Sequence, residues 1–395
     1  MVWDWWSWEK KMKELGEKDE RVVVLCADLT ESTRSEAFAK KFPERFIEIG
    51  VAEQNMATVA SGLANYGKIP FITSYAMFSP GRNWEQIRTT ICYNNVPVKI
   101  IGSHAGVSVG PDGATHQAIE DIAIMRAIPN ITIINPCDAE EARKATVASL
   151  EINGPVYIRL HREKTSMITT KDSPFQIGRA EILYGVEEGK VDAAIIACGP
   201  LVHSSILAAH ELEQKGLKIC VINNHTIKKM DEKTIVKAAE DAGAILTVEE
   251  HQIEGGMGSR VAEILAKTCP VPMEFIGVDN RFELHEAYLN AQLVRLLKTI
   301  GFDRHYVRAE GPYLFDEAGD KYLDCLSGYG VFTMGRNHPK IKKALVEALA
   351  ADLPSMVQMD CSLLAGQLAE KLVSYLPSDL NKVFFCNSGT EAVEA

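Results

Sequence analysis

Short apolar strands alternate with amphipathic helices along most of this 395-residue chain. Runs rich in β-branched residues are typical of buried strands, and residues with helical apolar spacing separate them. Strands are expected at residues 21–27, 46–49, 69–74, 98–103, 131–135 and 155–160, and helices at 52–65, 83–95, 117–127 and 138–150. This alternation predicts an α/β domain over residues 1–170, a parallel sheet with helices on both faces.

A second block of the same kind follows a charged, turn-rich connector at about residues 161–190. Strands are expected at 193–197, 218–223, 244–248 and 273–278, and helices at 202–214, 231–241 and 258–267. The pattern predicts a smaller α/β domain over residues 171–282, which is an ordinary size for a domain.

The pattern changes after Phe282. A helix is expected at 284–299, short strands within 306–324, helices at 339–351 and 362–376, and a last strand at 382–386. The printed sequence stops in NSGTEAVEA, where a further helix has just begun. Because a complete domain seldom ends at such a point, residues 283–395 are expected to form an incomplete α+β fragment.

Composition argues against several classes of function. A net charge of −11 without a basic stripe speaks against a nucleic-acid surface. The nine cysteines form no C-x-x-C pair, which is typical of reduced cytoplasmic thiols and not of disulfides or a metal site. No apolar stretch is long enough for a membrane span, and the start lacks a signal-peptide core. The tryptophans of MVWDWWSW are compatible with a helix face, a start-site artefact or an interface patch.

The run IEIGVAEQNM places one carboxylate, Glu53, between a short buried strand and the first turn of a helix. Burial disfavours the charged form of a carboxylate in such a position, whereas the helix N-terminus stabilises it. A group under these opposed influences can share a proton with a ring nitrogen, as an aminopyrimidine cofactor requires. The alternative is an exposed glutamate in a favourable first-turn position, so the rest of the chain has to decide.

Polar and aromatic residues follow most strands of the first block. They are Asp28 and Ser32 after the first strand, Glu53 after the second, Tyr75 and Phe78 after the third, His104, Asp112 and His116 after the fourth, and Arg159 and Arg162 at the sixth. Taken singly, such residues are more often core aromatics, satisfied histidines and solvated arginines. Because the carboxyl ends of parallel strands meet at one edge of a sheet, together they predict a ligand site.

Three motifs resemble the pyrimidine-binding domain of the transketolase family, which uses thiamine diphosphate. They are IGVAEQNM, SYAMFSPGRNWEQIR and GPDGATHQAIEDI. The segment VEEHQIEGGMGSRVAEIL resembles the C-terminal domain of the same family, so the resemblance covers about residues 15–282. The start near Met1 is similar to split transketolases, in which this half is a separate subunit.

The resemblance implies a role for each matching residue. Glu53 matches the glutamate that bonds the aminopyrimidine and favours its imino form, and Phe78, with Tyr75 alongside, matches the aromatic stacked on that ring. Asp28 matches a residue beside the thiazolium. The sugar-binding matches are His104 and His116 for proton transfer, Asp112 for a donor hydroxyl, and Ser32 and Arg162 for the phosphate, with Arg159 a weaker candidate.

Two departures from the family pattern limit what this chain does alone. No G-D-G motif with a downstream Asn is present, and in this family that motif holds the diphosphate through Mg²⁺. The Trp-rich start also replaces the usual pattern of the first helix. The diphosphate and Mg²⁺ are therefore expected on an N-terminal partner subunit, in a heterotetramer that contains a homodimer of this chain.

The last segment resembles a different family, the class III aminotransferases, which use pyridoxal phosphate. NSGTEA matches the loop that holds the cofactor phosphate, so Ser388, Gly389 and Thr390 would form that loop. The family's catalytic lysine has no counterpart after this loop, which predicts an incomplete cofactor site without transamination. The junction at 282–283 is interpreted as a rearranged or misassembled reading frame, with a genuine fusion as the alternative.

The sequence thus predicts a transketolase component that moves a two-carbon ketol unit between sugar phosphates. One alternative is the matching half of 1-deoxyxylulose-5-phosphate synthase, although THQAIEDI favours transketolase. Two further alternatives are a non-catalytic interaction subunit and the start of a bifunctional protein with an active aminotransferase.

Overall fold

The computed structural model describes residues 6–185, 189–279, 306–316, 319–325, 331–351, 362–377 and 380–386. The chain forms two compact units, Met1–Asn290 and Ala291–Ala395. The expected helix at 284–299, the junction at 282–283 and the loop Ser388, Gly389 and Thr390 lie outside the described residues. Among the helices that are described, none combines the length and the apolar character needed to cross a bilayer.

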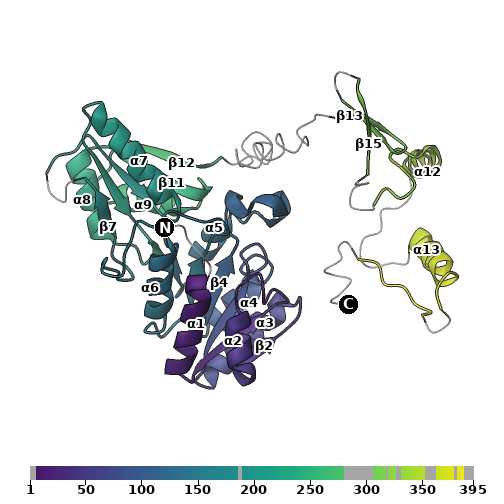
Figure 1. Cartoon of the computed structure of the whole chain (residues 1–395), viewed down its shortest axis with the longest axis horizontal. Helices are drawn as coiled ribbons and strands as arrows, with labels where there is room; N and C mark the ends of the chain where they lie inside the picture. Colours follow the sequence, from purple (N-terminus) through teal and green to yellow (C-terminus); the bar gives the residue numbers. More distant parts are fainter. Residues whose placement is uncertain are drawn as a thin grey trace. The chain divides into compact units, whose positions relative to one another are not determined.

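A seven-stranded sheet organises the first part of the chain, as the alternation predicted (Figure 1). Its order is β10 (Thr226–Lys228), β5 (Thr132–Ile134), β6 (Val156–Arg159), β4 (Lys99–Ser103), β3 (Ile69–Tyr75), β1 (Val22–Cys26) and β2 (Phe46–Glu48). All neighbouring strands are parallel except β10, which pairs antiparallel with β5. The expectation of a parallel α/β sheet is therefore confirmed for this part of the chain.

Helices cover both faces of this sheet because its strands are apolar on both sides. In β1, Val23 and Leu25 pack into one core cluster, whereas Val22 and Val24 pack into another. This division follows from the two-residue period of a strand. The first cluster includes residues of α3 (Glu53–Asn65), η2 (Ile87–Cys92) and α5 (Asp121–Arg126), and the second includes residues of α1 (Trp6–Lys18), α2 (Glu36–Lys41) and α6 (Ala139–Ser149).

The single helix expected at 83–95 is divided. A short α4 (Trp84–Gln86) runs directly into η2, which has π-helical hydrogen bonding. Local π-helical turns are often found next to functional sites.

A second, five-stranded sheet follows, with the order β12 (Met273–Val278), β11 (Ile245–Gln252), β8 (Ala193–Ala197), β9 (Ile219–Asn223) and β7 (Glu181–Tyr184). Its helices are α7 (Leu201–Gln214), α8 (Glu232–Ala242) and α9 (Met257–Leu265). β7 is antiparallel to β9 and lies inside the stretch that was expected to be a connector. Its four residues are half-buried at the sheet edge, so the sequence carries a weak strand signal there.

Strand β10 joins the two parts of this unit. Its chain segment comes from the second α/β block, yet it pairs with β5 of the first sheet. Only three residues take part, which is too short for a periodic sequence signal. The two blocks consequently share a sheet.

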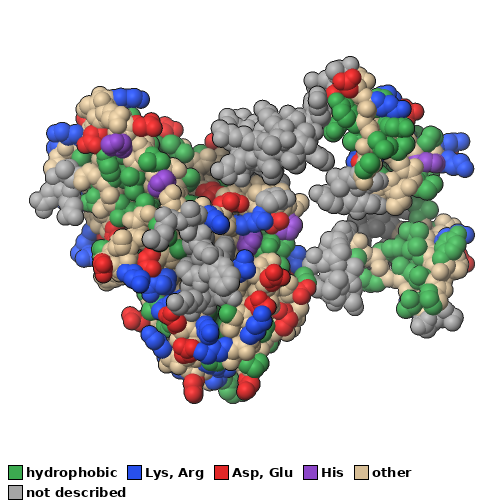
Figure 2. Space-filling model, viewed as in Figure 1, with side chains coloured by type: hydrophobic (Ala, Val, Ile, Leu, Met, Phe, Trp, Pro, Cys, Tyr) green, Lys and Arg blue, Asp and Glu red, His purple; other side chains and the backbone are tan. Residues whose placement is uncertain are grey.

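The second unit contains an antiparallel sheet of β13 (Tyr306–Glu310), β14 (Tyr313–Asp316) and β15 (Lys321–Leu323), with α12 (Pro339–Ala350) and α13 (Leu363–Val373). Neither helix buries a residue, and Leu349 and Leu363 are 82% and 75% exposed. Figure 2 shows apolar side chains on the surface of this unit. The prediction of a strand at 382–386 is wrong, because this segment pairs with no strand among the described residues.

Candidate active site

Aromatic rings from the end of β3 and from the segments that follow β3 and β4 meet at the carboxyl edge of the first sheet. Tyr75 is the last residue of β3 and Phe78 follows that strand, and their rings stack with centroids 6.1 Å apart. The Tyr75 ring also stacks on His104, which follows β4, at 3.9 Å. The His116 ring stands edge-on to Phe78 at 5.4 Å. These four rings, which the sequence predicted at one sheet edge, form a continuous cluster.

Glu53 is connected to this aromatic cluster through Arg82. The Glu53 side chain is 1% exposed, and its Oε2 lies 3.0 Å from Nη1 of Arg82. The Arg82 guanidinium also lies over the Phe78 ring, 4.8 Å from its centroid. A buried carboxylate of this kind needs a charged or hydrogen-bonding partner. The sequence analysis gave Arg82 no role, although its position four residues after Phe78 in SPGRN was a usable signal.

His104 combines burial with an unusual backbone conformation. Its φ is +54°, a region that non-glycine residues seldom adopt and that is often found at functional sites. Burial, together with the nearby charges of Arg162, Arg34 and His116, lowers the pKa of His104 from 6.5 to about 3. His104 is therefore neutral at physiological pH and can both donate and accept a hydrogen bond.

The two arginines near the end of β6 have different environments. Arg162 is half-buried, and its Nη1 donates to the carbonyl oxygen of Val109 at 2.6 Å. Arg159 is fully buried, and its Nε lies 2.8 Å from Oδ2 of Asp121. Its Nη2 donates to the carbonyl oxygens of Ala118 and Glu250. Arg159 is therefore part of a structural network and is not available to a sugar phosphate.

Asp28, Ser32 and Asp112 are exposed residues outside the aromatic cluster. The backbone of Asp28 has φ +55°, and its N–H donates to Oε1 of Glu48 at 2.7 Å. The other carboxylate oxygen of Glu48 accepts from Thr30 Oγ1 at 2.8 Å. Glu48 thus fixes the loop that carries Asp28. The sequence analysis missed Glu48 because a polar residue that alternates with apolar ones in a short strand resembles any exposed edge position.

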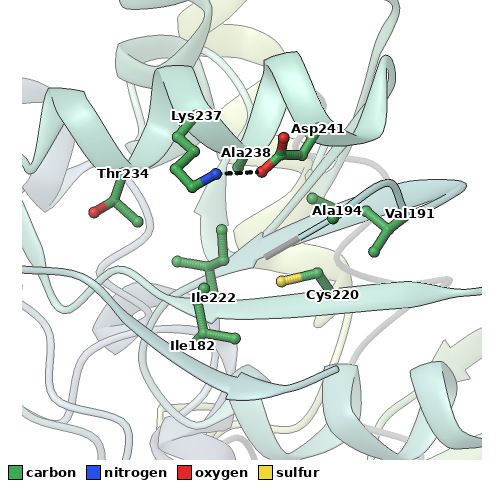
Figure 3. A pocket seen from close by; sticks show the side chains of 10 residues that line it. Ile182, Val191, Ala194, Cys220, Ile222, Thr234, Lys237, Ala238 and Asp241 are labelled. Carbon is green, nitrogen blue, oxygen red and sulfur yellow. Dashed lines mark hydrogen bonds and ion pairs between the residues drawn. The ribbon is translucent and has the colours of Figure 1, made fainter. Parts of the chain in front are cut away.

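A separate cavity of about 120 Å³ lies between α8 and the second sheet (Figure 3). Its walls are mostly apolar, with Ile182, Ala194 and Ile222 among them. Lys237 and Asp241 form an ion pair of 2.8 Å along α8 at this cavity. The cavity belongs to the second block and is distinct from the aromatic cluster.

The comparisons with known proteins agree with this geometry. Residues 6–167 match the transketolase pyrimidine-binding domain, and residues 180–282 match the transketolase C-terminal domain. A transketolase C-terminal section from Methanocaldococcus jannaschii is 46% identical over 255 residues, which cover 64% of this chain and 78% of that protein. This chain belongs to the transketolase family.

Other relatives are subunits of transketolases. The 6-deoxy-6-sulfo-D-fructose transketolase subunit SqwH of a Clostridium species is 40% identical over 269 residues, covering 68% of this chain and 82% of that subunit. A solved structure titled split gene transketolase, inactive beta4 tetramer, is 41% identical with a TM-score of 0.65, and covers 75% of this chain and 97% of that one. The resemblance to split transketolases is confirmed.

The resemblance of the last segment is also confirmed. Residues 299–395 match the class-III aminotransferase family. This chain is therefore a transketolase-type component followed by aminotransferase-like sequence.

Proposed function

We propose that this chain is one subunit of a split transketolase, which transfers a two-carbon ketol unit between sugar phosphates with thiamine diphosphate. The observation that carries the proposal is the buried Glu53 carboxylate, joined through Arg82 to the face of Phe78. The neutral His104 completes the same sheet edge.

The residues present fit the aminopyrimidine end of this cofactor. An aminopyrimidine needs a carboxylate for a ring nitrogen and an aromatic face for stacking, and Glu53 and Phe78 offer both. Arg82 contacts both groups in this structure, so a bound aminopyrimidine would replace part of its contacts. When bound, thiamine diphosphate supplies a carbon nucleophile for cleaving carbon–carbon bonds.

The remaining roles are proposed for the sugar. His104 and His116 would exchange protons with the hydroxyl groups at the reacting carbons, and the low pKa of His104 keeps its ring neutral, so that one ring nitrogen can accept a hydrogen bond from a hydroxyl. Asp112 would bond a donor hydroxyl, and Asp28 would lie beside the thiazolium. Arg162 and Ser32 would hold the phosphate, because a guanidinium suits a phosphate group in charge and shape.

We further propose that an N-terminal partner subunit holds the diphosphate and Mg²⁺. Among the described residues, no group of three or more His, Cys, Asp and Glu side chains is arranged to hold a metal ion. Two relatives are named as a transketolase C-terminal section and a transketolase subunit, which supports a separate partner. The solved split gene transketolase is described as an inactive beta4 tetramer, which supports the same proposal. The expected assembly is a heterotetramer that contains a homodimer of this chain.

The decisive experiment reconstitutes the chain with its N-terminal partner and compares two substrate pairs. Xylulose 5-phosphate with ribose 5-phosphate tests ketol transfer, and pyruvate with glyceraldehyde 3-phosphate tests the 1-deoxyxylulose-5-phosphate synthase alternative. Glu53→Gln should lower ketol transfer by about 10²–10⁴-fold, because proton transfer at the cofactor ring would lose its partner. Unchanged activity would instead support a non-catalytic interaction subunit.

For the aminotransferase-like segment we propose no transamination. The exposure of apolar residues on α12 and α13 supports this, because a catalytic domain would bury such faces. Adding pyridoxal phosphate to the full chain should give no absorbance band of a lysine aldimine. A band that disappears in a lysine variant would contradict the proposal.

A further inference from the structure

One carboxylate of the C-terminal domain reaches the loop that carries candidate sugar-binding residues. Glu250 lies in β11, is 7% exposed, and its Oε1 accepts a hydrogen bond from the backbone N–H of Ser108 at 2.6 Å. Gly106 makes room for this contact, because a Cβ built there would lie 2.4 Å from the same oxygen. The loop backbone is therefore shaped around the Glu250 side chain.

Glu250 is itself held firmly. Its Oε2 lies 3.1 Å from Nδ1 of His161, and its backbone carbonyl oxygen accepts from Nη2 of Arg159 at 2.9 Å. Burial works to raise the pKa of Glu250, but the neighbouring His161, Arg159 and the Ser108 N–H outweigh it and hold the pKa below its usual value. Glu250 is thus an ionised group with few alternative positions.

The loop that Glu250 contacts is a short, irregular turn. It forms the short turn η3 (Val107–Asp112), which is interrupted at Gly110, and it then leads to His116. Two neighbouring residues of the loop are bonded from outside. Glu250 accepts from Ser108 N–H, and Arg162 donates to the carbonyl oxygen of Val109. One anchor therefore comes from each α/β block.

We propose that Glu250 is a positioning residue for the sugar phosphate site, which fixes residues 106–113 so that Asp112, His116 and Arg162 can meet the substrate together. The inference rests on the proposed ketol transfer and assigns the C-terminal domain a share in it. Glu250 touches no reacting atom and acts through the Ser108 N–H and the Val109–Arg162 contact.

The experiment uses the full chain reconstituted with its partner subunit. Glu250→Gln keeps the shape but removes the charge, and Glu250→Asp keeps the charge but shortens the reach. Both should raise the KM for the donor sugar phosphate by about tenfold, as expected for losing one charge-assisted hydrogen bond. Affinity for thiamine diphosphate should change less than about twofold, because Glu53 and Phe78 do not depend on this loop.

Hydrogen exchange of the full chain gives a readout that is independent of activity. Amides of residues 106–113 should exchange about tenfold faster in both Glu250 variants. The matched control is Glu141→Gln, which changes another buried carboxylate that bridges the two blocks. Glu141 accepts from Cys137 N–H at 2.6 Å and from Asn223 Nδ2 at 2.7 Å, away from the loop. It should change stability without changing loop exchange or KM.

Three results would overturn the inference. They are unchanged loop exchange in both Glu250 variants, faster exchange with an unchanged KM, and an equal KM rise in Glu141→Gln. Absence of ketol transfer in the unmodified complex would refute the proposed function instead. In that case the exchange experiment still decides whether Glu250 holds the loop.

Discussion

Replacing Arg159 with methionine should strongly destabilise the first unit, whereas the same change at Arg162 should mainly remove activity. The Arg159 side chain is fully buried, and that of Asp121 is 2% exposed. Asp121 Oδ2 accepts from Arg159 Nε at 2.8 Å and from the Tyr157 hydroxyl at 2.6 Å. Without Arg159, the carboxylate would keep the Tyr157 hydroxyl as a hydrogen-bond donor but would lose its guanidinium partner.

The expected loss of unfolding free energy follows from the burial of this ion pair. Removing one member of a buried ion pair typically costs about 3–5 kcal/mol, because the other charge stays buried without compensation. For a unit of this size that corresponds to a fall in Tm of roughly 10 °C. Burial works to raise the pKa of Asp121 and Arg159 keeps it low, so this pKa should rise in the variant. A raised pKa of Asp121 in the folded variant favours its neutral form. The difference in unfolding free energy between the variant and the unmodified protein should therefore shrink as the pH falls.

Thermal unfolding of Arg159→Met and Arg162→Met, followed by calorimetry at pH 7 and pH 5, measures the difference. Arg162→Met should lose less than about 1 kcal/mol of unfolding free energy, since Arg162 is only half-buried and its hydrogen bond to the Val109 carbonyl oxygen is partly exposed. Adding Asp121→Asn to Arg159→Met should restore part of the stability, because no charge is then buried. A loss below about 1 kcal/mol for Arg159→Met, or an equal loss for both arginine variants, would refute this reasoning.

Three further predictions concern other parts of the chain. Arg82→Met should lower the unfolding free energy by about 1–3 kcal/mol, because Glu53 loses its ion pair. Thiamine diphosphate should raise the unfolding free energy of the reconstituted variant by more than it raises that of the unmodified complex. Burial lowers the pKa of His225 from 6.5 to about 4, so the unfolded chain binds this proton first as the pH falls. At pH 5 this shift lowers the unfolding free energy by about 2 kcal/mol. His225→Phe should therefore flatten the dependence of the Tm on pH between pH 7 and 5. Deleting residues 291–395 should shift the Tm of the remaining unit by less than about 2 °C, because Met1–Asn290 has its own core; a larger shift in calorimetry would contradict this.

The α/β organisation of residues 6–279 could be predicted because it depends on local patterns. Buried strands such as β1 and β3 are apolar runs, and the helices between them carry apolar residues at regular spacing. The same reasoning failed for β7, β10 and the expected strand at 382–386. These segments are short, and whether such a segment becomes a strand depends on a partner elsewhere in the chain.

The residues gathered at the sheet edge could also be predicted, since parallel strands bring their carboxyl ends together. Tyr75, Phe78, His104 and His116 meet there in the structure, while their chemical roles stay predictions. The ion pair of Glu53 with Arg82 could not be derived in the same way. It depends on the local turn after β3, which brings a side chain 29 residues away back to the carboxylate.

The sequence by itself determined the family, the order of the elements and the edge at which polar side chains gather, because all three are written in local patterns and motifs. The sequence ranked Arg159 below Arg162, but only the tertiary structure showed that Arg159, three positions before Arg162, is buried in a structural network. Arg159 is buried by Asp121, 38 residues away, and by Glu250, 91 residues away. Burial and charge pairing are decided by such distant partners, so one arginine became structural while the other remained at the candidate site.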